Sequence, residues 1–374
     1  MDEGLRVLQV NSGDGWSGGQ YQVLMLSKGL RDRGHHVVVA CPPGSALAEK
    51  GAREGLIVEP ISMRGQWDIG AVIRFREVMK RHRIQVLNTH KPKPHTLALM
   101  AAFFLQVPVV VATRRVSFPL RRHPFTRLKW VGGVDRIIAV AESVRETLIG
   151  SGVPKDHVET IYGAIDTERF HPRDPDPALK TELKIPEGMF IVGKVAAFRP
   201  WKGYSFFLEA AALVLKEEPN VRFLCIGEDS DHGREMKEKA RRLGIEENVT
   251  FTGYRDDVER FYPLLNVSVN CATGGEGLPG VLRESMAMAV PVVATDTGGN
   301  RELIHDGETG ILIPPEDARA LAQAILRLIR NPEEARDLGE KGRGFMEGRF
   351  SIQAMVSKTE AVYREIYRNK QRVS

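Results

Sequence analysis

Two glutamates with seven residues between them, Glu276 and Glu284, enclose the segment Gly-Leu-Pro-Gly-Val-Leu-Arg. An apolar run precedes this segment at 267–271, and a helix-like run follows at 281–288 and stops at Pro291. At such a strand-to-helix turn, the free N–H groups and the dipole of the new helix favour an anion, above all a phosphate. The spacing lets one carboxylate hold the near end of a bound molecule while the other reaches its far end.

The rest of the chain alternates strand-like and helix-like patterns, which predicts an α/β protein with parallel sheets. A length of 374 residues suits two domains, each large enough for its own core. We therefore expect two Rossmann-like domains that face each other across a ligand-binding cleft. The predicted strands are 5–10, 37–40, 85–88, 107–112, 136–140, 158–162, 190–195, 221–226, 249–252, 267–271, 290–294 and 310–313.

A proline-dense stretch at 166–177 divides the two strand series, because its prolines forbid a helix and favour an extended linker. This places an N-terminal domain at 1–170 and a C-terminal domain at 171–350. The tail at 351–374 has a helical pattern, and we expect it to cross back to the N-terminal domain.

The first predicted loop, 11–19, contains a literal GxGxxG at 13–18, so a dinucleotide site has to be weighed. A nicotinamide cofactor requires an acidic residue after the second strand, where this chain has Cys41 followed by two prolines. The pattern therefore argues against that cofactor. Gly18 and Gly19 would let the backbone approach a ligand closely, and a merely flexible turn remains the alternative.

Composition is that of a globular protein, with 42% hydrophobic and 27% charged residues. Residues 1–172 carry 24 lysines and arginines against 16 acidic residues, whereas the remainder carries 29 against 32. Three cysteines without metal-ligand spacing favour buried thiols in a reducing compartment. Without a secretory signal pattern, and with its most apolar window at 97–112 too short to span a bilayer, the chain is expected to be cytoplasmic, or peripheral at the inner face of the membrane.

Several motifs in a fixed order give the chain a family resemblance that extends nearly from end to end. It resembles the retaining glycosyltransferases of the two-Rossmann-domain (GT-B) fold, family 4 type, which include glycogen-synthase-like, mannosyl and lipopolysaccharide-core transferases. The paired glutamates are the most specific of these motifs. The others are Gly18-Gly19, 161–166, Lys202-Gly203, 251–253, 291–302 and 306–310.

The resemblance implies a role for each residue of a nucleotide-diphosphate-sugar site. Glu284 would bind the ribose, Glu276 would contact the transferred sugar, and Lys202 would neutralise phosphate charge, with no metal and no cofactor required. Where relatives carry a second phosphate-binding arginine this chain has Ala197, so Arg199 is the replacement to consider. The further donor contacts implied are Gly18, Gly19, Gly277, Leu278, Pro279, Gly280, Val281 and Tyr254.

The acceptor and sugar side is assigned to the first domain, where many relatives carry a histidine and this chain has Arg114 and Arg115. An arginine cannot serve as a neutral general base, so one at this position would act as a hydrogen-bond donor or anion clamp. His90 is the nearest histidine candidate, although an ordinary histidine at a strand end would have the same pattern. Asp14 is the one carboxylate in this domain to consider as a nucleophile.

The segment 114–130 interleaves cations with apolar and aromatic residues, a composition typical of an interfacial membrane-binding surface. A solvated basic face is the alternative. The segment suggests a lipid-linked or anionic glycan acceptor delivered at an anionic membrane, and no nucleic-acid-binding module accompanies it. Its residues are Arg114, Arg115, Arg121, Arg122, Arg127 and Lys129, with Phe118, Leu120, Phe125 and Trp130 between them.

These features together predict a metal-independent retaining glycosyltransferase that moves a sugar from a UDP- or GDP-type donor to a lipid-linked, cell-envelope polysaccharide or lipopolysaccharide acceptor. A sugar-nucleotide epimerase or hydrolase of the same fold is the alternative among enzymes of this architecture. A nicotinamide oxidoreductase and a non-catalytic nucleotide-sugar binder are the alternatives from other classes.

Overall fold

The computed structural model describes residues 4–120, 123–228 and 230–372. Its backbone separates into two compact units, the first comprising Met1–Ala164 and Ile352–Ser374 and the second Ile165–Ser351. The border between Ala164 and Ile165 lies just before the proline-dense stretch. Arg121 and Arg122 of the basic segment lie outside the described residues.

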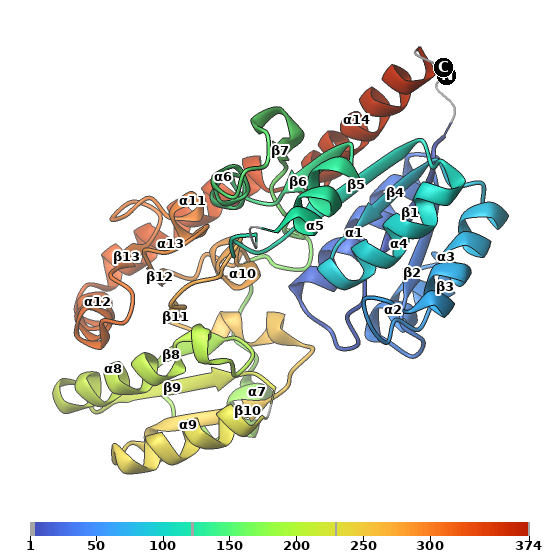
Figure 1. Cartoon of the computed structure of the whole chain (residues 1–374). Coiled ribbons are helices and arrows are strands. Elements are labelled where there is room, and N and C mark those ends of the chain that lie inside the picture. Colours follow the sequence, from blue (N-terminus) through green and yellow to red (C-terminus); the bar gives the residue numbers. More distant parts are fainter. Residues whose placement is uncertain (1–3, 121–122, 229, 373–374) are drawn as a thin grey trace. The chain divides into compact units, whose positions relative to one another are not determined.

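The first unit contains a seven-stranded parallel sheet of order β3-β2-β1-β4-β5-β6-β7 (Figure 1). Strand β3 was not among the predicted strands, because this short edge strand has a mostly exposed pattern and ends in a proline. The strands are β1 (Arg6–Val10), β2 (His36–Cys41), β3 (Ile57–Pro60), β4 (Val86–Thr89), β5 (Val109–Arg114), β6 (Arg136–Ala139) and β7 (Val158–Thr160).

Helices cover both faces of this sheet. The helix α1 packs against α2 and α14, and α3 packs against α4. Because the chain reverses direction across the sheet between β3 and β4, right-handed crossovers place these two groups on opposite faces. The helices are α1 (Gly18–Asp32), α2 (Ala46–Arg53), α3 (Ile69–Arg81), α4 (Pro92–Leu105), α5 (Pro124–Arg127), the π-helix η1 (Leu128–Gly132), α6 (Glu142–Gly150), the 3-10 helix η2 (Lys155–His157) and α14 (Ile352–Gln371).

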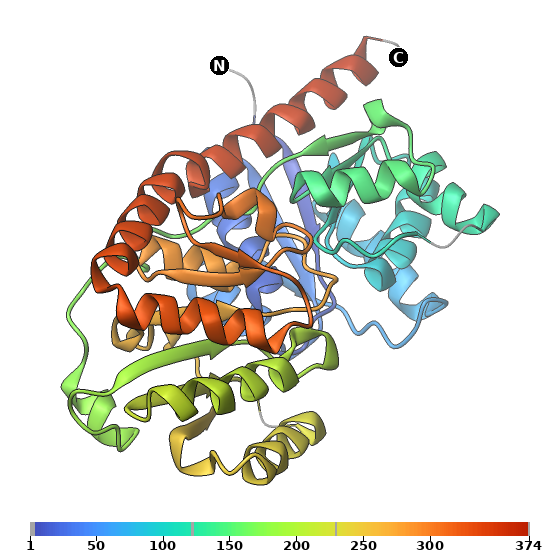
Figure 2. The ribbon, with the colours of Figure 1, turned by 90° about the vertical axis from the view of Figure 1, so that its left-hand side faces the viewer.

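The C-terminal helix α14 is part of the first unit (Figure 2). Val356 packs onto α1 at Gly29, where an added Cβ would lie 2.4 Å from its Cγ2 atom. Glu360 accepts from Arg33 at 2.9 Å and lies 3.1 Å from the Nε2 atom of His35. Within the described residues, no helix combines the length and the apolar character needed to cross a membrane.

The second unit contains a six-stranded parallel sheet of order β10-β9-β8-β11-β12-β13. Its strands are β8 (Phe190–Val195), β9 (Val221–Ile226), β10 (Val249–Gly253), β11 (Val267–Asn270), β12 (Val292–Thr295) and β13 (Ile311–Ile313). Its helices are α7 (Pro177–Glu182), α8 (Tyr204–Glu217), α9 (Asp231–Arg242), α10 (Gly280–Ala287), α11 (Asn300–Leu303), α12 (Ala318–Arg330) and α13 (Pro332–Arg349), with 3-10 turns η3 (Pro200–Lys202), η4 (Glu246–Asn248), η5 (Val258–Arg260) and η6 (Tyr262–Leu264).

Each sheet has one point where the strand order reverses, between β1 and β4 in the first unit and between β8 and β11 in the second. In open α/β sheets, ligands bind beyond the carboxyl ends of the strands at such a switch point. The loops that follow β1, β4, β8 and β11 are therefore where each unit should carry its functional side chains.

Candidate active site

The connection after β8 positions Lys202, because its backbone packs against the segment that follows β11. Gly203 has a left-handed backbone with φ of +72°, and an added Cβ would lie 1.8 Å from the carbonyl oxygen of Cys271. The N–H of Thr273 donates to the carbonyl of Trp201 at 2.9 Å. Only glycine fits this close approach, so the geometry requires glycine at position 203.

Lys202 and Glu276, predicted as phosphate and sugar contacts, form an ion pair in the second unit. Their side chains are 24% and 11% exposed, so the pair is shielded from most solvent but still accessible. An anion that approaches this lysine would compete with the carboxylate for it. The two side chains can therefore exchange partners when a charged ligand binds.

The loop after β12 packs closely against the backbone of Glu276 and Gly277. An added Cβ at Gly298 would lie 2.3 Å from the carbonyl oxygen of Glu276, and one at Gly299 would lie 1.7 Å from that of Gly277. The N–H of Gly299 also donates to the Glu276 carbonyl at 3.4 Å. This glycine pair belongs to the motif at 291–302, and a Gly-Gly pair shortly after a strand is the sequence signal for such a close approach.

Helix α10 begins at Gly280 without a side-chain cap. Its N-cap residue is Pro279, and the first turn holds no acidic side chain within this fully described helix. Gly277, Leu278 and Pro279 are buried, whereas Gly280 and Val281 are half-buried. No side chain therefore caps the N–H groups at the start of this helix, and the anion site predicted for this turn stays a prediction.

Glu284 is held by a buried tyrosine that the sequence analysis missed. The hydroxyl of Tyr262, from η6, donates to its Oε2 atom at 2.6 Å. Burial raises the pKa of the Glu284 carboxyl, while the Tyr262 hydrogen bond and the charges of Arg283 and Arg169 counteract that rise. The Oε1 atom lies 3.3 Å from the position of a Cβ added at Gly280, so glycine there leaves the carboxylate room.

Arg169, from the proline-dense stretch, is a second residue that the sequence analysis missed. It pairs with Glu259 at 2.7 Å and donates to the carbonyl of Asp256 at 3.1 Å. Its positive charge acts on both Glu284 and Tyr254. No sequence motif marks Arg169, because its partner Glu259 lies in η5, far away along the chain.

Two other predicted donor residues have exposed side chains. Arg199 is exposed at the start of η3 and Tyr254 is exposed after β10. The N–H of Lys202 donates to the Arg199 carbonyl at 2.9 Å, but among the described residues no side-chain hydrogen bond or ion pair joins the Arg199 guanidinium to Lys202 or Glu276. Position 197, where relatives carry the second arginine, is an exposed alanine.

At the switch point of the first unit, His90 and Arg115 come together. The Nε2 atom of His90 lies 2.7 Å from Oε1 of Gln9, and its Nδ1 atom lies 3.4 Å from an Arg115 guanidinium nitrogen. Since arginine can only donate, Nδ1 accepts and Nε2 carries the proton. Burial, and then the charge of Arg115, lowers the pKa of His90 well below its usual value, so the ring is neutral at pH 7.

A buried hydrogen-bond network supports this pair from α14. The Tyr363 hydroxyl accepts from the side-chain amides of Gln9 at 3.3 Å and Asn88 at 2.7 Å. Asn88 in turn accepts from the hydroxyl of Thr113 at 2.9 Å. The C-terminal helix therefore helps to position His90 through Gln9.

Arg114 lies apart from Arg115, since successive residues of a strand point to opposite faces. Its guanidinium lies 5.3 Å from the ring centre of the buried Trp130, and it donates to the carbonyl of Phe118. Burial lowers its pKa. Arg114 and Trp130 thus belong to the interior, and only part of the segment 114–130 is exposed.

The glycine pair Gly18-Gly19 was predicted within a loop, and this is wrong: α1 already begins at Gly18. The N–H of Tyr21 donates to Ser17 at 3.0 Å, which closes the first turn around both glycines. First-turn N–H groups have no intrahelical partner, so weak helix formers are tolerated there. A Cβ added at Gly19 would lie 3.9 Å from the Arg115 side chain, and exposed Asp14 lies in the loop before the helix.

Two Rossmann-like parallel-sheet units in tandem, with this glutamate–lysine arrangement in the second, define the GT-B class of glycosyltransferases. Residues 188–331 match the family model described as "Glycosyl transferases group 1", and residues 16–169 match "Glycosyltransferase Family 4". The chain belongs to the family 4 type glycosyltransferases.

Relatives and solved structures agree with this assignment. The chain is 30% identical to a phosphatidyl-myo-inositol mannosyltransferase of Mycobacterium tuberculosis over 345 residues, 84% of each chain. It is 34% identical to the putative glycosyltransferase EpsD of Bacillus subtilis over 220 residues, 58% of this chain and 57% of that protein. The structure of Anabaena Alr3699/HepE in complex with UDP-glucose has the same fold, with a TM-score of 0.85 at 20% identity over 96% of this chain and 100% of that one.

Proposed function

We propose that this glycosyltransferase transfers a sugar from a UDP- or GDP-type nucleotide sugar, with retention of anomeric configuration, to a lipid-linked or cell-envelope glycan acceptor. The observation that supports it best is the Lys202–Glu276 ion pair directly before the uncapped start of α10. A UDP-glucose complex of a fold neighbour and a phosphatidylinositol-directed relative support the donor and acceptor classes. Action at the cytoplasmic face of a membrane belongs to the same proposal.

In the proposed reaction, the bond between the anomeric carbon and the diphosphate oxygen breaks while a bond to an acceptor hydroxyl oxygen forms on the same face. The acceptor proton passes to the departing diphosphate. Lys202 and the α10 N–H groups stabilise the charge that develops on the diphosphate, so they favour the transition state over the ground state. Arg199 adds a second cation from an exposed position, and Glu284 holds the ribose hydroxyls.

Glu276 contacts the transferred sugar once Lys202 turns to the phosphate. In this proposal Gly18 and Gly19 contact the donor. His90, Arg115 and Asp14 contact the sugar or the acceptor. No metal and no cofactor takes part.

A nucleotide panel of UDP, GDP, ADP and NAD in a thermal-shift assay tests the donor class. We expect stabilisation by UDP or GDP, followed by sugar transfer to lipid acceptors from the matching donor with the α or β configuration retained in the product. Stabilisation by NAD alone would contradict the proposal. Donor hydrolysis or epimerisation without an acceptor would favour the alternative enzymes, and binding without turnover would favour a non-catalytic binder.

A further inference from the structure

Helix α4 is apolar on both faces, although only one face packs on the sheet. Leu97, Ala98, Ala101 and Ala102 are buried. On the other side, Phe103 is 79% exposed and Phe104 63% exposed. A helix that is apolar all round belongs in a protein interior or in lipid, so the outer face of α4 lacks its expected cover.

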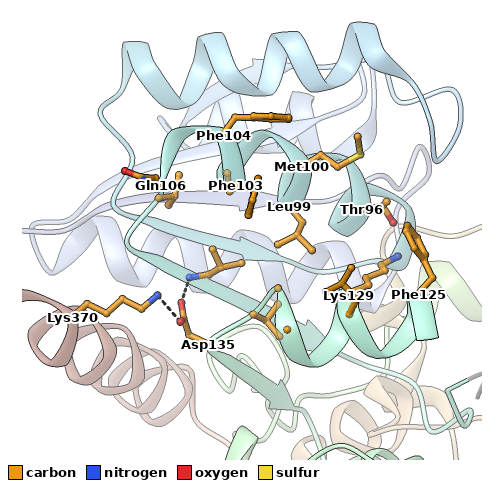
Figure 3. Close-up of a pocket in the computed structure, with 17 residues that line it drawn as sticks. Thr96, Leu99, Met100, Phe103, Phe104, Gln106, Phe125, Lys129, Asp135 and Lys370 are labelled. Atoms are coloured by element: carbon orange, nitrogen blue, oxygen red, sulfur yellow. Dashed lines mark hydrogen bonds and ion pairs between the residues drawn. The ribbon is translucent and has the colours of Figure 1, made fainter. Parts of the chain in front are cut away.

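This outer face forms one wall of a cavity of about 890 Å³ in the first unit. The opposite wall comes from α5, η1 and the turn before β6, and an exposed ring, Trp67, packs on Phe125 at the border with ring centres 5.6 Å apart. Figure 3 shows Phe125 and Lys129 at one end of the cavity and the Asp135–Lys370 pair at the other. The size is that of a site for a small organic ligand.

The charges that face the cavity differ between its two ends. Asp135 is compensated by Lys370 and accepts from the N–H of Val110 at 2.8 Å. Lys129 donates to the carbonyl of Pro92 at 2.6 Å and has no carboxylate partner among the described residues. Burial, and then the charge of Arg114, lowers the pKa of Lys129 to about 8.

A further cation stands at the edge of the apolar face, where the guanidinium of Arg76 lies 5.5 Å from the ring centre of Phe104. An apolar cavity with uncompensated cations at its rim matches an amphiphile with a hydrocarbon chain and an anionic head. A second copy of this chain fits less well. A two-fold interface would bring the same cations of both copies together.

We propose that the cavity between α4 and η1 binds one hydrocarbon chain of an anionic phospholipid from the membrane, with the phosphate beside Lys129. The exposed side chains of α4 then enter the interfacial layer of the bilayer. The proposal deepens the membrane part of the proposed function and rests on it. It assigns the apolar contact to α4, whereas the sequence pointed to the segment 114–130.

The test uses the full-length chain and acceptor-free vesicles of phosphatidylcholine, with or without phosphatidylglycerol, whose acyl chains carry bromine. Vesicle flotation measures binding, and bromine quenching of tryptophan fluorescence measures contact with the chains. We expect binding that requires phosphatidylglycerol, together with quenching that is largely lost in Trp67→Phe. The double variant Phe103→Ser/Phe104→Ser should lower the partition coefficient at least about tenfold.

The matched control is Ile57→Ser, which removes an exposed apolar side chain from β3 at the far edge of the same sheet and should bind as wild type. Lys129→Gln should reduce the preference for phosphatidylglycerol while quenching persists. Flotation without quenching, equal binding to both lipids, no binding, or a wild-type dimer that the double variant dissociates would each overturn the proposal. Nucleotide-induced thermal shifts measured in parallel are independent of it and report on the donor site alone.

Discussion

The switch points of the two units use polar side chains in opposite ways. In the second unit, Lys202 and Glu276 are both ionic and partly accessible, and they lie in the connections that follow β8 and β11. In the first unit, Gln9, His90 and Tyr363 are buried and neutral and hydrogen-bond to one another. One site can exchange ionic partners with a ligand, whereas the other is fixed by its own interior.

This difference suits two different tasks, the binding of a diphosphate and the orientation of a neutral hydroxyl. A site that must bind and release a diphosphate needs charges that can be redirected, and loops at a helix start supply them. A site that only orients a neutral hydroxyl benefits from a rigid frame, which a satisfied buried network provides. Variants in the second unit should therefore change turnover, and variants in the network of the first unit should change how the acceptor is held.

The largest effect is expected for Lys202→Ala. Without the ammonium group, the charge on the departing diphosphate loses its nearest side-chain cation, and kcat should fall about 100- to 1,000-fold. Steady-state transfer with a saturating donor measures this. Lys216→Ala, at an exposed position of α8, is the matched control; an unchanged kcat in Lys202→Ala would remove this lysine from the mechanism.

Gly299→Ala should have the next largest effect. The new Cβ would overlap the carbonyl oxygen of Gly277, so the loop before α10 must move, at a cost of about 1–3 kcal/mol in the free energy of unfolding. The donor KM should rise as the α10 N–H groups shift. Gly274→Ala is the control, since its Cβ would meet no atom within 4 Å; equal melting temperatures and KM values for the two variants would refute the support role.

Tyr262→Phe should move the pH dependence of nucleotide binding. The carboxylate of Glu284 must be ionised to accept from ribose hydroxyls, so affinity should fall as the pH drops through its raised pKa. Removal of the Tyr262 hydroxyl takes away a hydrogen bond that lowers this pKa, so the fall should begin at higher pH. At pH 6 the loss of affinity should be about tenfold, corresponding to ~1.4 kcal/mol.

Calorimetric titration with the nucleotide between pH 5 and 8 measures how affinity depends on pH in the wild-type protein and in Tyr262→Phe. A parallel loss of affinity at every pH would show that the hydroxyl has only a packing role. Glu284→Gln serves as the reference, because its amide cannot ionise and its profile should be flat in this range.

The sequence predicted the elements and contacts that depend on neighbouring residues, and it missed those that depend on packing. The strands of the second unit follow from local apolar runs, and the start of α10 follows from a short motif around Gly280. Tyr262 looks like a core aromatic in the sequence, and only the fold brings its hydroxyl to Glu284. Arg169 was likewise hidden in a linker. The window at 97–112 was interpreted only as too short to span a bilayer, so the apolar outer face of α4 was missed.

The smallest effect is expected for Tyr363→Phe, which tests the buried hydrogen-bond network of the first unit. Loss of the hydroxyl leaves the amides of Gln9 and Asn88 without an acceptor and should cost about 1 kcal/mol of stability. Because Gln9 also orients His90, the acceptor KM should rise about threefold, a change of ~0.6 kcal/mol. Nucleotide affinity should be unchanged.

Tyr367→Phe separates positioning from stability, because Tyr367 lies on the same helix and accepts from Gln85 at 2.9 Å, next to the amino end of β4 and away from His90. It should lose similar stability without any change in the acceptor KM. Equal acceptor KM values in the two variants would mean that the network only stabilises the fold. A rise confined to Tyr363→Phe would show that α14 reaches the acceptor site through Gln9 and His90.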